Sequence, residues 1–225
     1  MLKIGVRVPR RFEAAGEYLA DVRALDASGV DSLWLEPAGY EPWLVLAAIA
    51  AVTGSARLMV PIVLAEGLGP SMLEDRLTTL HRLSRGRVAL TITGASPRGV
   101  PPHDLVAVSR RHDCPVMAAA GGIEEACAVA CWADGVIGLG DSPERVGAAL
   151  PAIIQSREEA GVKPTFELWA PIPMPDGRGR WRSARAAYEA AGATGIIVPA
   201  DPRLLDLLRN GDEEDDRADL ELSQG

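Results

Sequence analysis

The sequence predicts a compact (β/α)8 TIM barrel without large insertions, and three observations lead to that fold class. Short apolar strands alternate with helical segments along the chain, the unit recurs eight times, and no linker rich in proline or serine interrupts it. Alternation of this kind implies parallel strands joined by right-handed crossovers. Eight units favour a closed barrel over an open doubly wound sheet, which stays the alternative.

The elements follow from local signals. Pro42 suits a first helical position, Gly29 ends the helix before it, and "DSPE" is a helix start signal. The expected strands are 2–8, 32–36, 57–64, 87–93, 115–120, 135–139, 165–171 and 195–199. The expected helices are 13–27, 42–53, 70–84, 104–111, 123–132, 141–160, 181–191 and 201–210.

Composition sets limits on the class of protein. The chain has 225 residues and a net charge of −8, much of it in the acidic tail. We expect one domain over 1–210 and a solvated, disordered tail over 211–225. An acidic chain without a basic block argues against nucleic acid, and no apolar run is long enough to cross a membrane. The beginning is typical of a strand rather than a signal peptide, so we expect a cytoplasmic protein.

Several kinds of reactive site are missing from the sequence. Cys127 and Cys131 lie one helical turn apart without a second ligand pair, which favours packed thiols. The three histidines are scattered, so no metal site is expected. The sequence also contains neither a G-x-S-x-G elbow nor a P-loop.

Several phrases resemble the bacterial luciferase-like family of flavin- and F420-dependent oxidoreductases. They are "ASGVDSLWLE", "EPWLVLAAIAAVTGSARLMV", "LTTLHRLSRGRVALTITGAS" and "CPVMAAAGGIEEACAVACWADGVI". The similarity covers roughly residues 2–160 and continues weakly beyond them. It implies a TIM barrel that holds F420 or FMN at the carboxyl ends of its strands. The chain is short for this family, so an open site or a partner subunit that closes it is implied.

Pro61 interrupts the apolar run "RLMVPIVLAEG", although proline has no N–H for a strand ladder. In the family, the end of the third strand carries a cis peptide behind the flavin ring, and the resemblance places it at Val60–Pro61. An X–Pro bond adopts cis at about 0.5–1 kcal/mol, against about 2.5–4 for other residues. The alternative is a trans proline at a strand bulge, with no cofactor.

Other positions depart from the family pattern. The fourth strand reads "TITGAS", so Thr91 and Thr93 replace glycines that let a ligand approach the backbone, and only Gly94 remains. Gly94 also stands where some members hold the cofactor phosphate with arginine, and we expect Arg98 to substitute. The alternative for Arg98 is a solvent-facing loop residue.

The loop before the fifth helix is a candidate phosphate site. The N–H groups of Gly121, Gly122 and Ile123 lie at a helix N-terminus, where the dipole favours an anion. Glu124 and Glu125 would repel a phosphate, and they serve equally well as first-turn acids.

The ends of the strands supply the candidates for catalysis. Glu36 and Glu66 follow the second and third strands, His103 lies in the loop after the fourth, and Trp169 is placed to stack on a ring. Each has a structural alternative. Glu36 could be a carboxylate at the barrel rim and Glu66 a charged loop residue. His103 could be a solvated histidine, and Trp169 could pack inside the barrel.

The resemblance implies an oxidoreductase that acts on a small organic substrate. With F420 it would transfer hydride, and with reduced FMN supplied by a separate reductase it would monooxygenate. The alternatives are a degenerate barrel that binds flavin without turnover or binds nothing, and an enzyme of unrelated chemistry. Relatives of this kind form homodimers through their second and third helices, so "PWLVLAAIAAV" is expected to lie partly in an interface.

Overall fold

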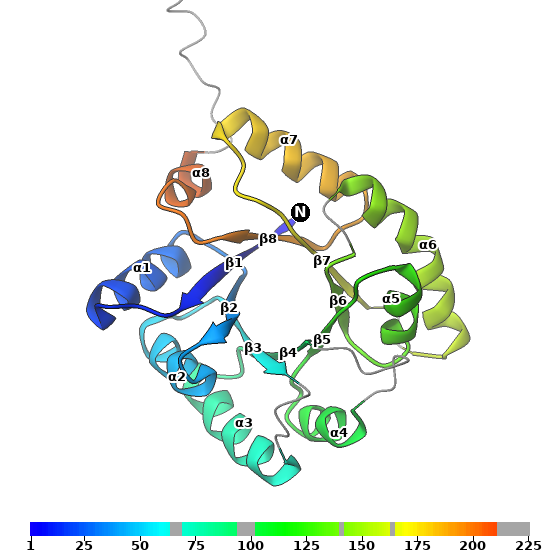
Figure 1. Cartoon of the computed structure of the whole chain (residues 1–225), viewed down its shortest axis with the longest axis horizontal. Helices are drawn as coiled ribbons and strands as arrows, with labels where there is room; N and C mark the ends of the chain where they lie inside the picture. Colours follow the sequence, from blue (N-terminus) through cyan, green and yellow to red (C-terminus); the bar gives the residue numbers. More distant parts are fainter. Residues whose placement is uncertain (64–68, 94–101, 140–141, 163–164, 211–225) are drawn as a thin grey trace, which may run out of the picture.

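The computed structural model describes residues 1–63, 69–93, 102–139, 142–162 and 165–210. Eight parallel strands close into a barrel in sequence order, and the helices surround it (Figure 1). The strands are β1 (Lys3–Arg10), β2 (Ser32–Gly39), β3 (Arg57–Val63), β4 (Val88–Thr93), β5 (Val116–Ala119), β6 (Gly135–Ile137), β7 (Glu167–Pro171) and β8 (Gly195–Pro199). The helices are α1 (Ala15–Ala27), α2 (Pro42–Val52), α3 (Pro70–Ser84), α4 (His103–Arg111), α5 (Ile123–Ala130), α6 (Pro143–Glu159), α7 (Gly177–Ala190) and α8 (Leu204–Asn210). The predicted fold class is confirmed.

Three boundaries differ by three residues or more from the predictions: the end of β2 and the starts of α7 and α8. β2 continues to Gly39 instead of ending at Glu36, because it pairs again with β1 beyond a register shift. α7 begins at Gly177 rather than Trp181. The two glycines of "GRGR" disfavour a helix locally, but Arg178 pairs with Asp206 of α8 at 3.2 Å and ties this turn to the next helix.

The interior of the barrel is filled by one apolar residue from each strand except β1. Trp34 and Trp169 are the largest of them, and their rings pack edge to face with centroids 5.3 Å apart. The full inner cluster is Trp34, Met59, Ala89, Met117, Ile137, Trp169 and Ile197. A separate and larger apolar layer lies between the strands and the helices.

Glycines make room for the two indoles. A Cβ on Gly5 would lie 2.4 Å from Nε1 of Trp34, and one on Gly195 would lie 2.4 Å from Cζ3 of Trp169. Distances below 3.0 Å are overlaps that side chains do not tolerate without a shift of the surrounding atoms. β1 therefore contributes no side chain to the inner cluster, and Gly5 leaves the space that Trp34 occupies.

Charged residues close the amino-terminal end of the barrel. Glu167 accepts hydrogen bonds from Lys3 Nζ and Arg57 Nη1, each at 2.8 Å, and from Nε1 of Trp169 at 2.9 Å. Burial alone would raise the pKa of Glu167, but the hydrogen bonds from Lys3 and Trp169 and the charge of Arg57 bring it below its ordinary value. This carboxylate therefore stays ionised and links three strands.

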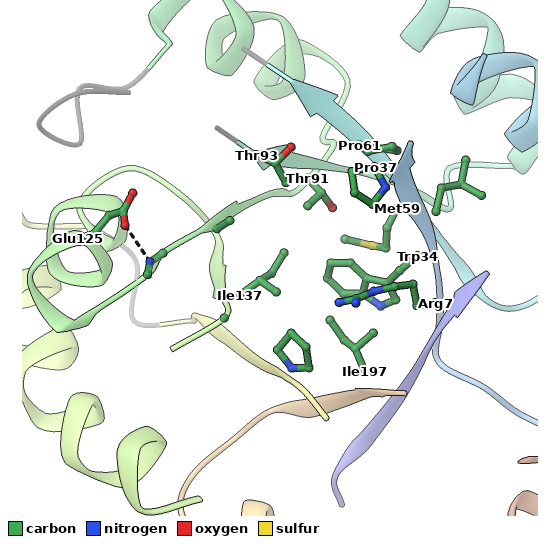
Figure 2. Close-up of a pocket in the computed structure, with 16 residues that line it drawn as sticks. Arg7, Trp34, Pro37, Met59, Pro61, Thr91, Thr93, Glu125, Ile137 and Ile197 are labelled. Atoms are coloured by element: carbon green, nitrogen blue, oxygen red, sulfur yellow. Dashed lines mark hydrogen bonds between the residues drawn. The ribbon is translucent and has the colours of Figure 1, made fainter. Parts of the chain in front are cut away.

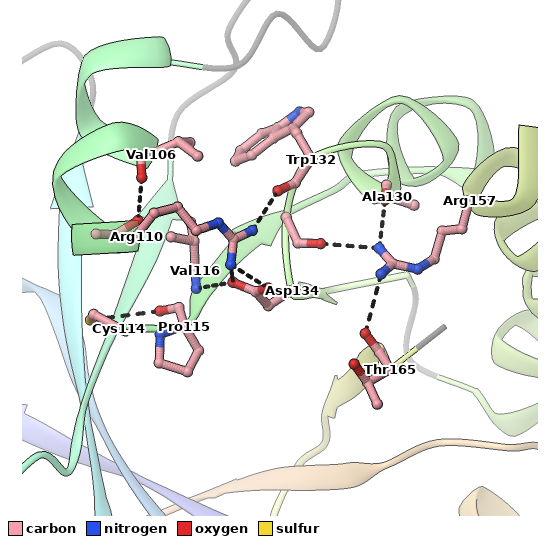
Figure 3. Close-up of polar contacts among 12 residues, drawn as sticks. Val106, Arg110, Cys114, Pro115, Val116, Ala130, Trp132, Asp134, Arg157 and Thr165 are labelled. Atoms are coloured by element: carbon pink, nitrogen blue, oxygen red, sulfur yellow. Dashed lines mark hydrogen bonds and ion pairs between the residues drawn. The ribbon is translucent and has the colours of Figure 1, made fainter. Parts of the chain in front are cut away.

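Two polar clusters hold the turns at the same end (Figure 3). Asp134 pairs with Arg110 at 2.8 Å and accepts the backbone N–H of Val116, also at 2.8 Å. The buried Arg157 donates to backbone carbonyls of Ala130, Ala133 and Thr165. Arg157 thereby satisfies the carbonyl of the last residue of α5 and carbonyls in the segments before β6 and β7.

Pro61 lies in an unbroken strand. The β3–β4 register runs without a shift from Leu58 to Val63, and the described residues contain no cis peptide. The Val60–Pro61 bond is therefore trans, and the expectation of a cis bond there is wrong. The alternative placed a trans proline at a bulge, and the bulge is absent as well.

The neighbouring strand explains why proline is tolerated here. The N–H of Arg57 donates towards β2 and that of Leu58 towards β4, so alternation directs the nitrogen of Pro61 towards β2. Pairing between β2 and β3 ends at Met59. The missing N–H of Pro61 therefore costs no ladder hydrogen bond.

No helix in the described part of the chain is long and apolar enough to cross a membrane. Among the same residues, no group of three His, Cys, Asp or Glu side chains is arranged to hold a metal ion. Cys127 is half-buried and Cys131 is exposed, so the expectation of a packed thiol is wrong for Cys131. Cys131 follows the last residue of α5 and lies at the helix end.

We expect Gly195→Ala to lower the free energy of unfolding by about 1–3 kcal/mol, because the new methyl group would overlap Trp169. Urea denaturation measures the loss. Gly16→Ala is the matched control, since a Cβ there meets nothing within 4 Å and alanine favours the α1 helix. Equal stability of Gly195→Ala and wild type would contradict the packing described here.

Candidate functional site

A cavity of about 540 Å³ opens at the carboxyl ends of the strands (Figure 2). Trp34, Met59, Ile137 and Ile197 belong to the inner cluster and also border the cavity, so that cluster forms its floor. The rest of the described wall consists of Arg7, Leu35, Pro37, Pro61, Thr91, Thr93, Ala119, Ala120, Gly121, Glu125, Gly138 and Pro171. This is the end at which TIM barrels carry their active sites, and the size is that of a small-molecule pocket.

The wall formed by β5, β6 and the segments after them consists of small residues. Ala119, Ala120, Gly121 and Gly138 all border the cavity. Gly138 has a φ of +90°, which favours glycine, and a Cβ there would lie 3.4 Å from the carbonyl of Ala120. A flat ligand can therefore approach the backbone on this side.

Two threonines bring hydroxyl groups to the wall from β4. Thr91 is only 8% exposed, and its hydroxyl has no hydrogen-bond partner among the described residues. The Thr93 hydroxyl lies 3.5 Å from the carbonyl of Ile62. A buried hydroxyl without a partner costs free energy, so the Thr91 hydroxyl lowers the stability of this wall.

The charged groups of the described wall are Arg7 and Glu125. Glu125, in the first turn of α5, accepts a 2.8 Å hydrogen bond from the backbone N–H of Gly121 (Figure 2). Arg7 projects from β1 into the barrel (Figure 2). Arg7 is not among the site residues predicted from the sequence. Its spacing from Gly5 was the available signal, because residues two apart in a strand point to the same face.

The Glu125 carboxylate already occupies part of the predicted phosphate site at 121–123. The Gly121 N–H is taken by Glu125, Gly122 is the extended residue before α5, and Ile123 is 45% exposed. Of these three residues, Gly121 is the one that borders the described cavity. An anion at this position would have to displace the Glu125 carboxylate.

Other predicted cofactor residues divide between the cavity and the core. Pro61 and Thr93 border the cavity. Trp169 is 1% exposed and lies in the inner cluster without bordering the cavity, which matches its structural alternative of barrel packing. Val60 lies in the apolar layer towards the helices. Gly94 and Arg98 lie outside the described residues.

The predicted catalytic residues are not brought together. His103 is the first residue of α4 and is exposed, and neither His103 nor Glu36 borders the cavity. Glu66 lies outside the described residues. The structure therefore assembles no acid–base pair from these three within the described part of the chain.

Glu36 lies in an irregular stretch of β2. The β1–β2 register jumps from Val8–Leu35 to Arg10–Gly39, so β2 has two extra residues between these pairs. Pro37 borders the cavity instead, and its carbonyl accepts a hydrogen bond from Arg10.

The charge of Glu36 affects the pKa of Tyr18, which does not border the cavity. Burial and then the charge of Glu36 raise the pKa of Tyr18 in α1 to about 12.

No protein-family model matches the sequence, and no curated protein matches it. Solved structures do match. The F420-dependent tetrahydromethanopterin reductase of Methanopyrus kandleri has a TM-score of 0.70 at 13% identity, over 94% of this chain and 98% of that chain. An F420-dependent secondary alcohol dehydrogenase has a TM-score of 0.68 at 12% identity, over 93% of this chain and 96% of that chain.

The monooxygenase RslO1 of Streptomyces bottropensis has a TM-score of 0.63 at 18% identity, over 94% of this chain and 98% of that chain. The chain shares the fold of these proteins. Two of these proteins are F420-dependent enzymes and one is a monooxygenase.

We expect Thr91→Val to leave the free energy of unfolding unchanged or to raise it by about 1 kcal/mol, because it removes a buried hydroxyl that has no partner. Thr53→Val is the control: its hydroxyl donates to the Ile49 carbonyl at 2.8 Å, and its loss should cost about 1 kcal/mol. Chemical denaturation of both variants measures the difference. A clear loss of stability in Thr91→Val would show that its hydroxyl is already satisfied.

Proposed function

We propose that this protein is an oxidoreductase of the luciferase-like type that binds F420 or reduced FMN in the cavity at the carboxyl ends of its strands. The observation that carries the proposal is the cavity itself: an apolar floor and a wall of small residues, in a barrel whose fold neighbours include F420-dependent enzymes and a monooxygenase. The sequence resemblance supports the same reading independently.

The wall fits the ring system of either cofactor. Trp34, Met59 and Ile197 offer apolar contact from below, and Gly138 permits close approach from the side. The unpartnered hydroxyl of Thr91 suits the polar edge of a flavin or deazaflavin. The phosphate group fits less well at the start of α5, because Glu125 already occupies the Gly121 N–H.

When bound, the cofactor supplies hydride transfer in the case of F420, or oxygen chemistry in the case of reduced FMN from a separate reductase. The chain's own residues position it and exclude water from one side, because the floor beneath the cavity is buried. The substrate is a small organic molecule that enters from the open end.

A second candidate function is a barrel that binds flavin without turnover or has lost its cofactor. Glu125 at the predicted phosphate loop favours it, as do the threonines that replace glycines in β4. In addition, Glu36 and His103 do not border the described cavity. Binding and turnover with each cofactor separate the two functions.

We expect F420, FMN or both to bind, and Ala119→Leu to weaken binding at least about tenfold by filling the cavity. Fluorescence titration with each cofactor measures the affinity. Ala187→Leu, on the exposed face of α7, is the matched control and should bind as the wild type does. The absence of binding for both cofactors up to millimolar concentration would contradict the proposal.

We also propose a homodimer through α2 and α3, as the resemblance implies. Leu44 and Leu83 are 72% and 52% exposed, and both line a groove between these helices. We expect Leu44→Glu to convert the dimer to a monomer, measured by sedimentation at micromolar concentration. Ile154→Glu, 47% exposed on α6, should leave it dimeric. A wild-type protein that sediments only as a monomer would contradict this proposal.

A further inference from the structure

Arg7 occupies an inward-facing position at the functional end of the barrel. Lys3, Gly5 and Arg7 share one face of β1, since alternate residues of a strand point the same way. The backbone of Arg7 is fixed on both sides, by register with Trp34 of β2 and by its carbonyl, which accepts the N–H of Ala200 at 2.9 Å. Figure 2 shows the guanidinium over the apolar floor of the cavity.

The charge of Arg7 is not neutralised within the described protein. No hydrogen bond or ion pair joins its guanidinium to another described side chain. The charged residues inside the opposite end behave differently, because Lys3 and Arg57 both pair with Glu167 at 2.8 Å. Arg7 is exposed at the open end of the cavity, so its guanidinium is accessible and free to pair with a ligand from outside the chain.

The other charged group of the cavity wall directs an anion towards Arg7. Glu125 follows β5, which lies opposite β1 in the ring of eight strands. Its carboxylate holds the Gly121 N–H and repels a second anion at the start of α5. The cavity therefore has a negative side at α5 and a positive side at β1, with the apolar floor between them.

We propose that the cavity binds a small molecule whose apolar body rests on the floor and whose oxyanion, a carboxylate or a phosphate, pairs with the Arg7 guanidinium. A planar guanidinium offers two parallel N–H donors that match the spacing of oxyanion oxygens. Thr91, whose hydroxyl has no partner among the described residues, is a second polar residue of the same wall. The oxyanion comes either from a substrate or, on the proposed function, from the phosphate of FMN.

The test compares three probes of similar shape: benzoate, phenyl phosphate and the neutral benzamide, each titrated into the full chain by NMR. We expect the two anions to bind wild type about tenfold more tightly than benzamide. Arg7→Gln should abolish that preference, and Arg7→Lys should retain part of it. Arg23→Gln, an exposed arginine on α1, removes the same charge and should keep the preference.

Glu125→Gln tests the negative side of the cavity, and it should keep or strengthen the preference for the two anions. Two results would overturn the assignment of Arg7: no preference for anions in wild type, or a preference that survives in Arg7→Gln. The probes contain no flavin, so the result stands even where neither F420 nor FMN binds, and failure of the proposed function is seen separately.

A comparison of FMN with riboflavin identifies the source of the oxyanion. If Arg7 holds the phosphate, wild type binds FMN more tightly than riboflavin, and Arg7→Gln binds the two equally. If both flavins bind wild type equally while benzoate retains its preference, the oxyanion belongs to the substrate.

Discussion

The edge-to-face packing of Trp34 and Trp169 is the interaction on which the rest of this structure depends. A closed eight-stranded barrel has an interior that side chains must fill, and here the two indoles are the largest side chains that fill it. They fit because Gly5 and Gly195 leave space on the neighbouring strands. Large and small residues are thus matched across adjacent strands, and replacing either kind disturbs the other.

The same packing divides the barrel into two ends with different roles. Trp169 bonds through its indole N–H to Glu167, which gathers Lys3 and Arg57 and closes the amino-terminal end. Trp34 reaches the cavity and forms part of its floor. Stability therefore resides at one end and the candidate site at the other, as is typical of TIM barrels.

Charge is distributed unevenly around the cavity, and this distinguishes the chain from the pattern it resembles. The α5 N-terminus, which the sequence marks as a phosphate site, carries its own carboxylate at Glu125. The unpaired cation of the described wall comes instead from Arg7 on β1. A ligand that bears an oxyanion would therefore lie across the apolar floor with its charge towards β1. This is the side away from the loop before α5, where the sequence predicts the phosphate.

The eight repeated units, the closed barrel and the end that carries the candidate site follow from local periodicity and from the order of strands and helices, so the sequence predicts them. Which side chains meet depends on how the strands pair in the folded chain. Glu36 lies in the stretch where the β1–β2 register shifts and does not border the cavity. Pro61 lies trans in a regular strand, just beyond the point where β2 stops pairing at Met59. Both depend on a neighbouring strand that lies outside the local pattern. Alternation and composition therefore placed Pro61, Thr93 and Gly121 at the cavity, but they missed Arg7 and wrongly suggested Glu36 and His103.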